Sequence, residues 1–134
     1  MTQRTTNYIA VIWSLMILII VFIPGDKIPN HGDWMDVFQL DKAIHCLLFA
    51  PFSFFWLLKY HIANTLSSKV TSIVITIGVM LAIVTEVVQF YFIKGRNGNI
   101  ADALADIVGI FIGLLIFKIL KKREILHFLV RKEI

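Results

Sequence analysis

The sequence has few of the features that build soluble enzymes and binding modules. It contains one cysteine, Cys46, which excludes an internal disulfide and a zinc site made of cysteines. It has no glycine-rich phosphate loop, no dinucleotide fingerprint and no Cys/His spacing typical of a metal site. Only 16% of its 134 residues are charged, against about 25% in soluble domains. The motifs therefore assign no cofactor and no metal ligands.

Long apolar runs take the place of these features. Apolar residues make up 58% of the chain, compared with about 45–50% in soluble domains. They gather in segments at 8–23, 43–58, 70–93 and 101–120. A spanning helix needs about 20 apolar residues, so the last two segments are long enough and flanking residues can extend the first two. Because a backbone in lipid must satisfy its own hydrogen bonds, we predict a single all-α membrane domain over 1–134, a small bundle of four transmembrane helices.

The distribution of basic residues predicts the orientation of this bundle. A cytoplasmic amino terminus puts nine of the 13 Lys and Arg residues inside and four outside. That excess is the one that the positive-inside rule requires, so both termini are predicted to be cytoplasmic. The tail 121–134 mixes apolar residues with Lys and Arg, which predicts a basic amphipathic segment on the membrane surface. Because the basic residues flank membrane segments, the net charge of +4 does not indicate a nucleic-acid partner.

Polar and ionisable residues lie at or just inside one set of segment ends, those on the predicted outer side. A charged side chain at the bilayer centre costs about 2.5–3.5 kcal/mol, so such residues need partners and usually mark functional sites. A shared polar pocket would accommodate all of them. The candidate ligand-binding residues are Asp41, Lys42, His45, Glu86, Gln89, Arg96, Asp102 and Asp106.

Spacing places several of these residues on common helix faces. Asp41 and His45 are four apart on the second segment, although capping the helix would equally explain Asp41. Glu86 lies roughly 10 Å below the outer end of the third segment, at a rise of about 1.5 Å per residue. We expect it to face the interior and to pair with Arg96 or His45, or to be protonated.

The fourth segment carries a single stripe with two parts. Asp102, Asp106, Gly109 and Gly113 follow one another at helical spacing. The acidic outer part is predicted to join the polar cluster, with helix capping as an alternative for Asp102. The inner Gly-x-x-x-Gly part predicts close packing of two helices.

The chemistry of this cluster leaves several functions open: hard-metal ligation, a proton relay, acid–base catalysis, or recognition of a lipid phosphate or sugar. The leading interpretation is an outward-facing pocket for an anionic lipid or wall-precursor headgroup. Arg96, with Lys42 or Lys94, would hold the anion, and membrane lipids are the expected partners. The alternative is an intramembrane hydrolase or transferase with His45 or Glu86 as catalytic base, or with the carboxylates and His45 holding a divalent ion. A third interpretation is a structural cluster for helix association.

The ordered motifs resemble the VanZ-like family of bacterial membrane proteins. The resemblance rests on Asp41-Lys42-x-x-His45 followed by Phe49, on Glu86-x-x-Gln89, on Gly95-Arg96, and on Asp102, Ala105, Gly109 and Gly113. It is strongest over 41–113 and implies a small multi-pass protein of the bacterial cytoplasmic membrane. The family is named for a member that lowers susceptibility to the glycopeptide teicoplanin, which implies a cell-envelope setting. One departure is Asp106, where the family pattern often has Asn.

Overall fold

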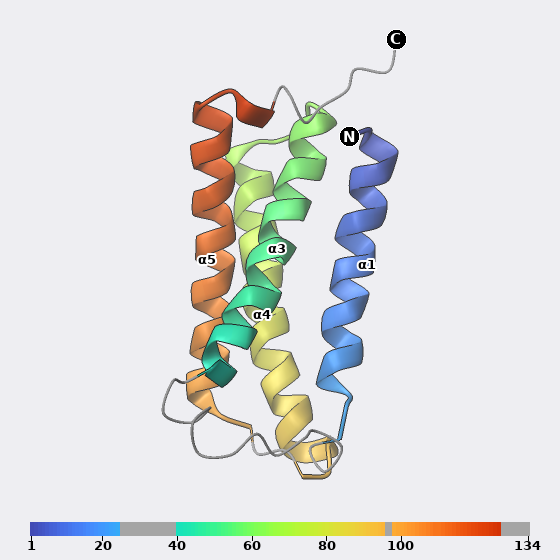
Figure 1. Cartoon of the computed structure of the whole chain (residues 1–134), viewed down its shortest axis with the longest axis vertical. Coiled ribbons are helices and arrows are strands. Elements are labelled where there is room, and N and C mark those ends of the chain that lie inside the picture. Colours follow the sequence, from blue (N-terminus) through green and yellow to red (C-terminus); the bar gives the residue numbers. More distant parts are fainter. Residues whose placement is uncertain (25–39, 96–97, 127–134) are drawn as a thin grey trace.

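The computed structural model describes residues 1–24, 40–95 and 98–126, with side chains in the second helix described from residue 42 onward. Within these ranges the chain forms helices and no strand: α1 (Gln3–Val21), α3 (Leu40–Ile62), α4 (Ser68–Phe92) and α5 (Ile100–Lys122). Each of the four is long and apolar enough to cross a membrane. They run alternately up and down along one long axis (Figure 1). The predicted all-α bundle is confirmed, and flanking residues extend the two shorter segments.

Side-chain caps determine where three of the helices begin. The hydroxyl of Thr2 accepts from Thr5 N at 3.1 Å, and that of Ser67 accepts from Val70 N at 3.2 Å. The amide oxygen of Asn99 accepts from Ala101 N at 3.0 Å. Each cap satisfies a backbone N–H that has no partner within the first turn of its helix. The residue that caps α5 is therefore Asn99, and the capping alternative for Asp102 is not needed.

The alternating helix directions gather most of the basic residues at one end of the bundle. The start of α1, the end of α3, the start of α4 and the end of α5 all lie there (Figure 1). Lys59 at this end places its ammonium 4.4 Å from the centroid of the Trp56 ring, as expected of an interfacial side chain. Which membrane face this end occupies remains a prediction. After α5, Glu124 turns left-handed with φ 56°, and Leu126 packs back onto the bundle. The rest of the predicted amphipathic tail lies outside the described residues.

The contact between α3 and α5 is the most extensive in the molecule. A Cβ on Gly109 would collide with the backbone of Cys46, and one on Gly113 would collide with the carbonyl of Ala50. Only glycine permits such an approach, which confirms the predicted small-residue seam. Ser53 Oγ of α3 also donates a hydrogen bond to Ile110 O of α5 at 2.8 Å, which stabilises the same contact.

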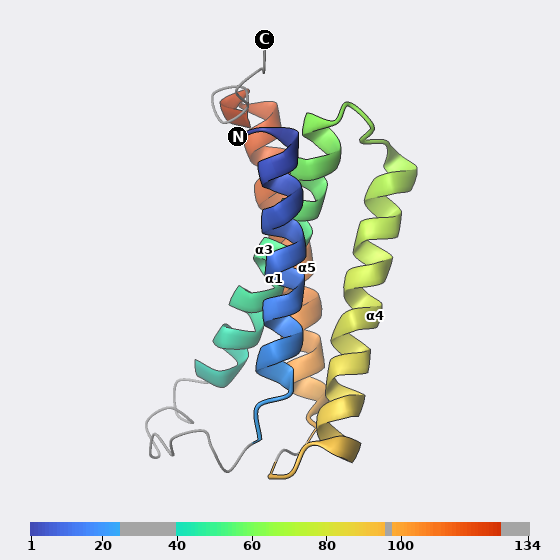
Figure 2. The same ribbon diagram turned by 90° about the vertical axis from the view of Figure 1, so that its right-hand side faces the viewer.

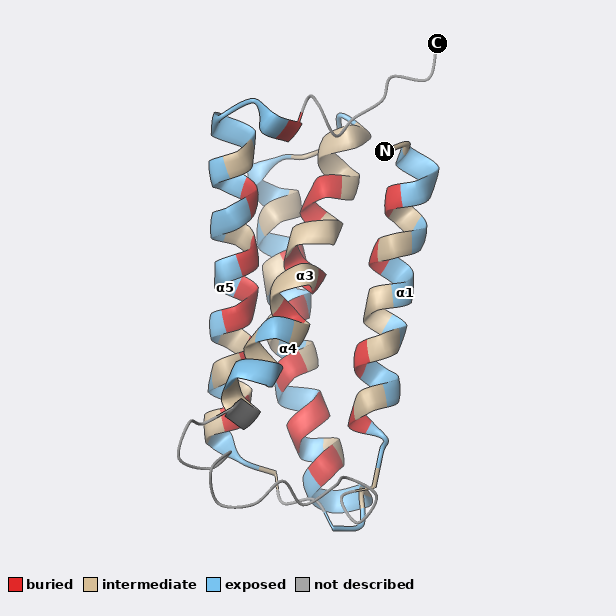
Figure 3. Cartoon of the chain, viewed as in Figure 1, coloured by how far each residue is buried: buried red, intermediate tan, exposed pale blue. Residues whose placement is uncertain are grey.

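By contrast, α1 and α4 make the least contact among the helix pairs that touch. Figure 2 shows α4 standing apart from α1 over much of its length, and Figure 3 shows that buried residues form narrow stripes on each helix. Pro51 removes one backbone hydrogen bond inside α3, and the turns before it run at an angle to the turns after it (Figure 2). Trp13 Nε1 of α1 donates to Leu48 O at 2.7 Å beside this bend. This hydrogen bond attaches α1 to α3 close to the bend.

Candidate functional site

The close approach of α3 and α5 creates the first part of the site. Gly109 lies against the backbone of Cys46, so the residues next to this contact are forced together. Asp106, one turn before Gly109, meets His45, the neighbour of Cys46. His45 Nδ1 and Asp106 Oδ1 are 3.0 Å apart, and Asp106 is only 1% exposed. The glycine seam thus brings together a half-buried imidazole and a buried carboxylate.

The connection between α4 and α5 positions the third group, Glu86. A Cβ on Gly98 would lie 2.8 Å from the carbonyl oxygen of Glu86 and 2.7 Å from Phe90 Cβ, so glycine is needed for the connection to fold back onto α4. Asn99 N then donates to Glu86 Oε2 at 2.9 Å. One carboxylate oxygen of Glu86 is therefore held by the residue that caps α5.

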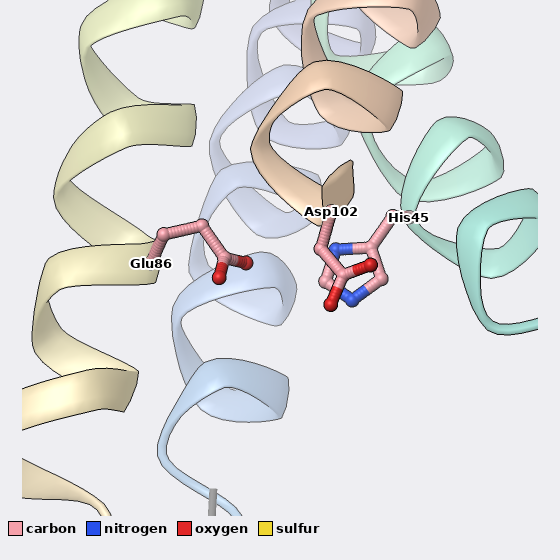
Figure 4. Close-up of side chains that lie close together, drawn as sticks. All are labelled: His45, Glu86 and Asp102. Carbon is pink, nitrogen blue, oxygen red and sulfur yellow. The ribbon is translucent and has the colours of Figure 1, made fainter. Parts of the chain in front are cut away.

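These groups converge with Asp102 on a common point. Ligand-type atoms of His45, Glu86 and Asp102 all lie within 4.8 Å of one another. The three side chains come from α3, α4 and α5 and face one another in Figure 4. Glu86 and Asp102 are each 8% exposed. His45 is half-buried. Because the three groups lie on different helices, the packing of the helices sets their positions relative to one another.

A cavity of about 210 Å³ opens beside this cluster between α1, α3 and α4. Its polar end consists of His45, Thr85, Glu86, Gln89 and Asp106. The remaining lining is apolar and comes from α1 and α3: Ile17, Ile20, Val21, Ile23, Ile44, Leu48 and Phe49. The cavity therefore has one polar end and one apolar wall.

A second cavity, of about 370 Å³, follows along the same seam between α1 and α4. It begins at Leu18 and Leu81, next to the residues that line the first cavity, and extends to Tyr60 and Ile73. Nearly all of its lining is apolar. The least packed seam of the bundle therefore contains two cavities, one beside the polar cluster and one nearer the other end of α1 and α4.

The structure brings together five of the predicted site residues: His45, Glu86, Gln89, Asp102 and Asp106. It does not bring in the other three within the part of the chain that it describes. Lys42 is half-buried at the start of α3 and forms no ion pair with another described residue. The side chain of Asp41 and the whole of Arg96 lie outside the described residues.

Sequence reasoning missed the role of Asn99 as the hydrogen-bond partner of Glu86. The signal was present, because Asn in front of an apolar helix is a typical cap. The sequence does not show how the connection between α4 and α5 folds. In the structure, Gly98 lies close against α4, and this brings the cap residue Asn99 back to that helix.

Comparison with protein families gives one result that agrees with this architecture. The VanZ/LLP1 family model matches residues 3–121, a range that includes α1, α3 and α4 in full and nearly all of α5. No curated protein and no solved structure matches the chain. The match extends beyond the motifs between 41 and 113 to the first helix, which forms one wall of the cavity.

Proposed function

The chain belongs to the VanZ/LLP1 family, and from this premise we propose that it binds the headgroup of an anionic amphiphile at the polar cluster. The amphiphile would be a membrane lipid or a lipid-linked wall precursor of the cell envelope. Its acyl part would lie along the seam between α1 and α4. The protein itself is a VanZ-like multi-pass membrane protein.

The two-part lining of the cavity carries this proposal. An amphiphile has a polar head and an apolar chain, and the cavity offers a polar end beside an apolar wall. Gln89 is 5% exposed in this lining and can donate to or accept from a headgroup oxygen through its amide. The second, apolar cavity extends the path along the same seam, as a long hydrocarbon chain requires.

Charge adds a condition to this proposal. The described ionisable groups of the cluster are the carboxylates of Glu86, Asp102 and Asp106 and the imidazole of His45. Carboxylates repel a phosphate, so a cation has to stand between them and an anionic headgroup. Arg96 is the residue proposed for that task, because its planar guanidinium binds phosphate oxygens in pairs.

Lipid retention tests whether the cavity is the binding site. The protein is extracted with native lipids and analysed by native mass spectrometry. Ile44→Trp, on the cavity wall, is expected to displace a co-purifying lipid from the complex. Leu47→Trp is the matched control, because Leu47 lies on the same helix and is exposed like Ile44 (68% and 47%), but does not line the cavity. Equal lipid retention in wild type and Ile44→Trp would count against the cavity as the site.

Headgroup charge is tested in nanodiscs with defined probes. Phosphatidylglycerol and a polyprenyl phosphate are compared with zwitterionic phosphatidylcholine. Arg96→Ala is expected to lower binding of both anionic probes at least tenfold, while Arg4→Ala, the same change at the start of α1, leaves it unaltered. The two anionic probes distinguish a bulk lipid from a lipid carrier.

In cells, teicoplanin susceptibility of strains expressing wild type or Ile44→Trp measures whether the site acts on the envelope.

A second candidate function has one specific observation in its favour. The pairing of His45 Nδ1 with Asp106 Oδ1 at 3.0 Å is the arrangement that orients a histidine as a general base. An intramembrane hydrolase that activates water at His45 would use it. Turnover of a bound lipid that stops in His45→Ala supports this enzyme. If His45→Ala and Glu86→Gln lower only thermal stability and leave lipid binding and the envelope phenotype intact, the cluster is structural.

A further inference from the structure

Three helices each contribute one metal-type donor to the cluster. His45 of α3, Glu86 of α4 and Asp102 of α5 have ligand atoms within 4.8 Å of one another (Figure 4). Ligands of Zn²⁺ lie about 2.0–2.2 Å from the ion in a tetrahedral arrangement, so two of them are about 3.3–3.6 Å apart. The ligand atoms of the cluster, which lie within 4.8 Å of one another, reach that spacing with side-chain shifts of about 1 Å. The three donors are therefore within reach of one ion.

The partner of His45 favours the same conclusion. Metal-bound histidines almost always donate their other ring N–H to a carboxylate or carbonyl, which fixes the tautomer and the direction of the ring. His45 Nδ1 lies 3.0 Å from Asp106 Oδ1. With the proton on Nδ1, the lone pair is on Nε2, which is the ring nitrogen that would bind a metal.

The side chain of Glu86 supplies an independent observation. Its Oε2 accepts the hydrogen bond from Asn99 N, whereas its Oε1 is buried and has no hydrogen-bond partner among the described residues. Glu86 is 8% exposed, so water does not readily satisfy that oxygen. Buried polar atoms without a partner are rare, and a bound ion is one of the standard reasons for them. Oε1 belongs to the carboxylate that faces His45 and Asp102 in Figure 4.

We propose that His45, Glu86 and Asp102 form a binding site for a divalent transition-metal ion, with Zn²⁺ as the expected occupant and Asp106 as a positioning residue. One imidazole and two carboxylates suit Zn²⁺ better than Ca²⁺ or Mg²⁺, which prefer oxygen ligands alone. Three protein ligands leave a fourth position for water or another oxygen ligand. Because His45 and Glu86 also line the cavity, that ligand can come from a molecule bound there.

Metal binding is measured on the whole protein, purified in detergent with an affinity tag that contains no histidine. After removal of metal with a chelator, titration with Zn²⁺ followed by elemental analysis is expected to give one tightly bound ion per chain. Zn²⁺ is expected to bind more tightly than Mn²⁺, following the usual order of affinities, and Mg²⁺ weakly. A chain that retains no stoichiometric Zn²⁺ overturns the proposal.

Matched variants assign the ion to these residues. His45→Ala, Glu86→Gln and Asp102→Asn are each expected to abolish stoichiometric Zn²⁺ binding. His61→Ala on the same helix and Glu124→Gln after α5 lie at the opposite end of the bundle and are expected to retain it. Equal loss in the controls, or retention in all three site variants, overturns the assignment.

Two further measurements keep the proposal testable if a site variant does not fold. Zn²⁺ is expected to raise the melting temperature of the metal-free wild type, and Mg²⁺ at the same concentration to leave it unchanged. An unchanged melting temperature with Zn²⁺ counts against the site.

Asp106→Ala is expected to weaken Zn²⁺ binding about 10–100-fold and to shift the visible spectrum of the Co²⁺-substituted protein, because the carboxylate orients His45. A merely structural Asp106 would alter neither. Lipid retention is measured separately, so the metal site can fail while headgroup binding stands, and the reverse.

Discussion

The contact between α3 and α5 and the seam between α1 and α4 are the two extremes of packing in this bundle. At the first, glycines allow two backbones to touch and a serine joins them by a hydrogen bond. At the second, side chains leave two successive cavities. In lipid there is no hydrophobic force between helices, so close packing has to hold the bundle together. The difference is one of packing: the first helix pair leaves no room between its backbones, and the second leaves space beside its side chains.

The polar cluster lies where these two regions meet. His45 and Asp106 belong to the tight contact, and Glu86 and Gln89 belong to the helix that borders the open seam. A rigid pair on one side and an accessible cavity on the other are what a binding site in a membrane protein requires. Four changes test this comparison, and they are taken from the largest expected effect to the smallest.

The largest loss of stability is expected from a substitution in the glycine contact between α3 and α5. Gly113→Ala places a methyl group against the carbonyl of Ala50, which is backbone and cannot move without separating α3 from α5. We expect the variant to lose about 3 kcal/mol of stability, at the upper end of ordinary overpacking. Gly78→Ala is the graded control, because its Cβ would meet side chains and no backbone: Ile110 Cδ1 at 3.1 Å and Phe52 Cε1 at 3.2 Å. Thermal unfolding in detergent measures both, and equal melting temperatures would contradict the difference between backbone and side-chain contact.

The buried pair is the next most sensitive part. Asp106→Ala leaves the Nδ1 group of His45 without its carboxylate, at a cost of about 1–3 kcal/mol for an unsatisfied buried polar group. Asp106→Asn keeps an oxygen in the same place, so we expect it to cost clearly less. Thermal unfolding of the two variants separates the hydrogen bond from the charge. If Asp106→Asn is as unstable as Asp106→Ala, the negative charge itself is required.

The sequence predicted the spans, the glycine contact and the depth of the polar residues because each is local or periodic. Apolar length indicates a span, and a four-residue spacing places Gly109 and Gly113 on one face. Burial of Glu86 followed from the cost of exposing a carboxylate to lipid. These inferences needed no knowledge of which helices are neighbours.

The remaining features depend on contacts between segments that are distant in the chain. Nothing in the pattern around Glu86 indicates that Asn99 N binds its Oε2, because that bond depends on how the connection folds back. The pairing of His45 with Asp106 depends on the register of α3 against α5. The cavities depend on the weak contact between α1 and α4, and helical periodicity does not encode the separation of two helices.

The attachment of α1 is expected to be weaker than the glycine contact. Trp13 Nε1 donates to Leu48 O at 2.7 Å, close to the bend at Pro51. Trp13→Phe keeps an aromatic ring and removes the donor, so we expect a loss of about 1 kcal/mol. Thermal unfolding gives the size of the loss. Cysteine cross-linking between α1 and α4 then shows whether the two helices move apart in Trp13→Phe. Unchanged cross-linking would mean that the hydrogen bond from Trp13 to Leu48 O does not control their separation.

The smallest effect is expected from the hydrogen bond inside the tight contact. Ser53→Ala removes the bond to Ile110 O, and such bonds in membrane proteins contribute about 0.6 kcal/mol on average. A Cβ on Gly113 would also meet Ser53 Oγ, so Ser53→Ala relieves part of the overlap created by Gly113→Ala. The carbonyl of Ala50 remains in place, and the double variant should therefore stay nearly as unstable as Gly113→Ala alone. Recovery of most of the lost melting temperature would show that the serine, and not the backbone, sets how closely α3 and α5 approach.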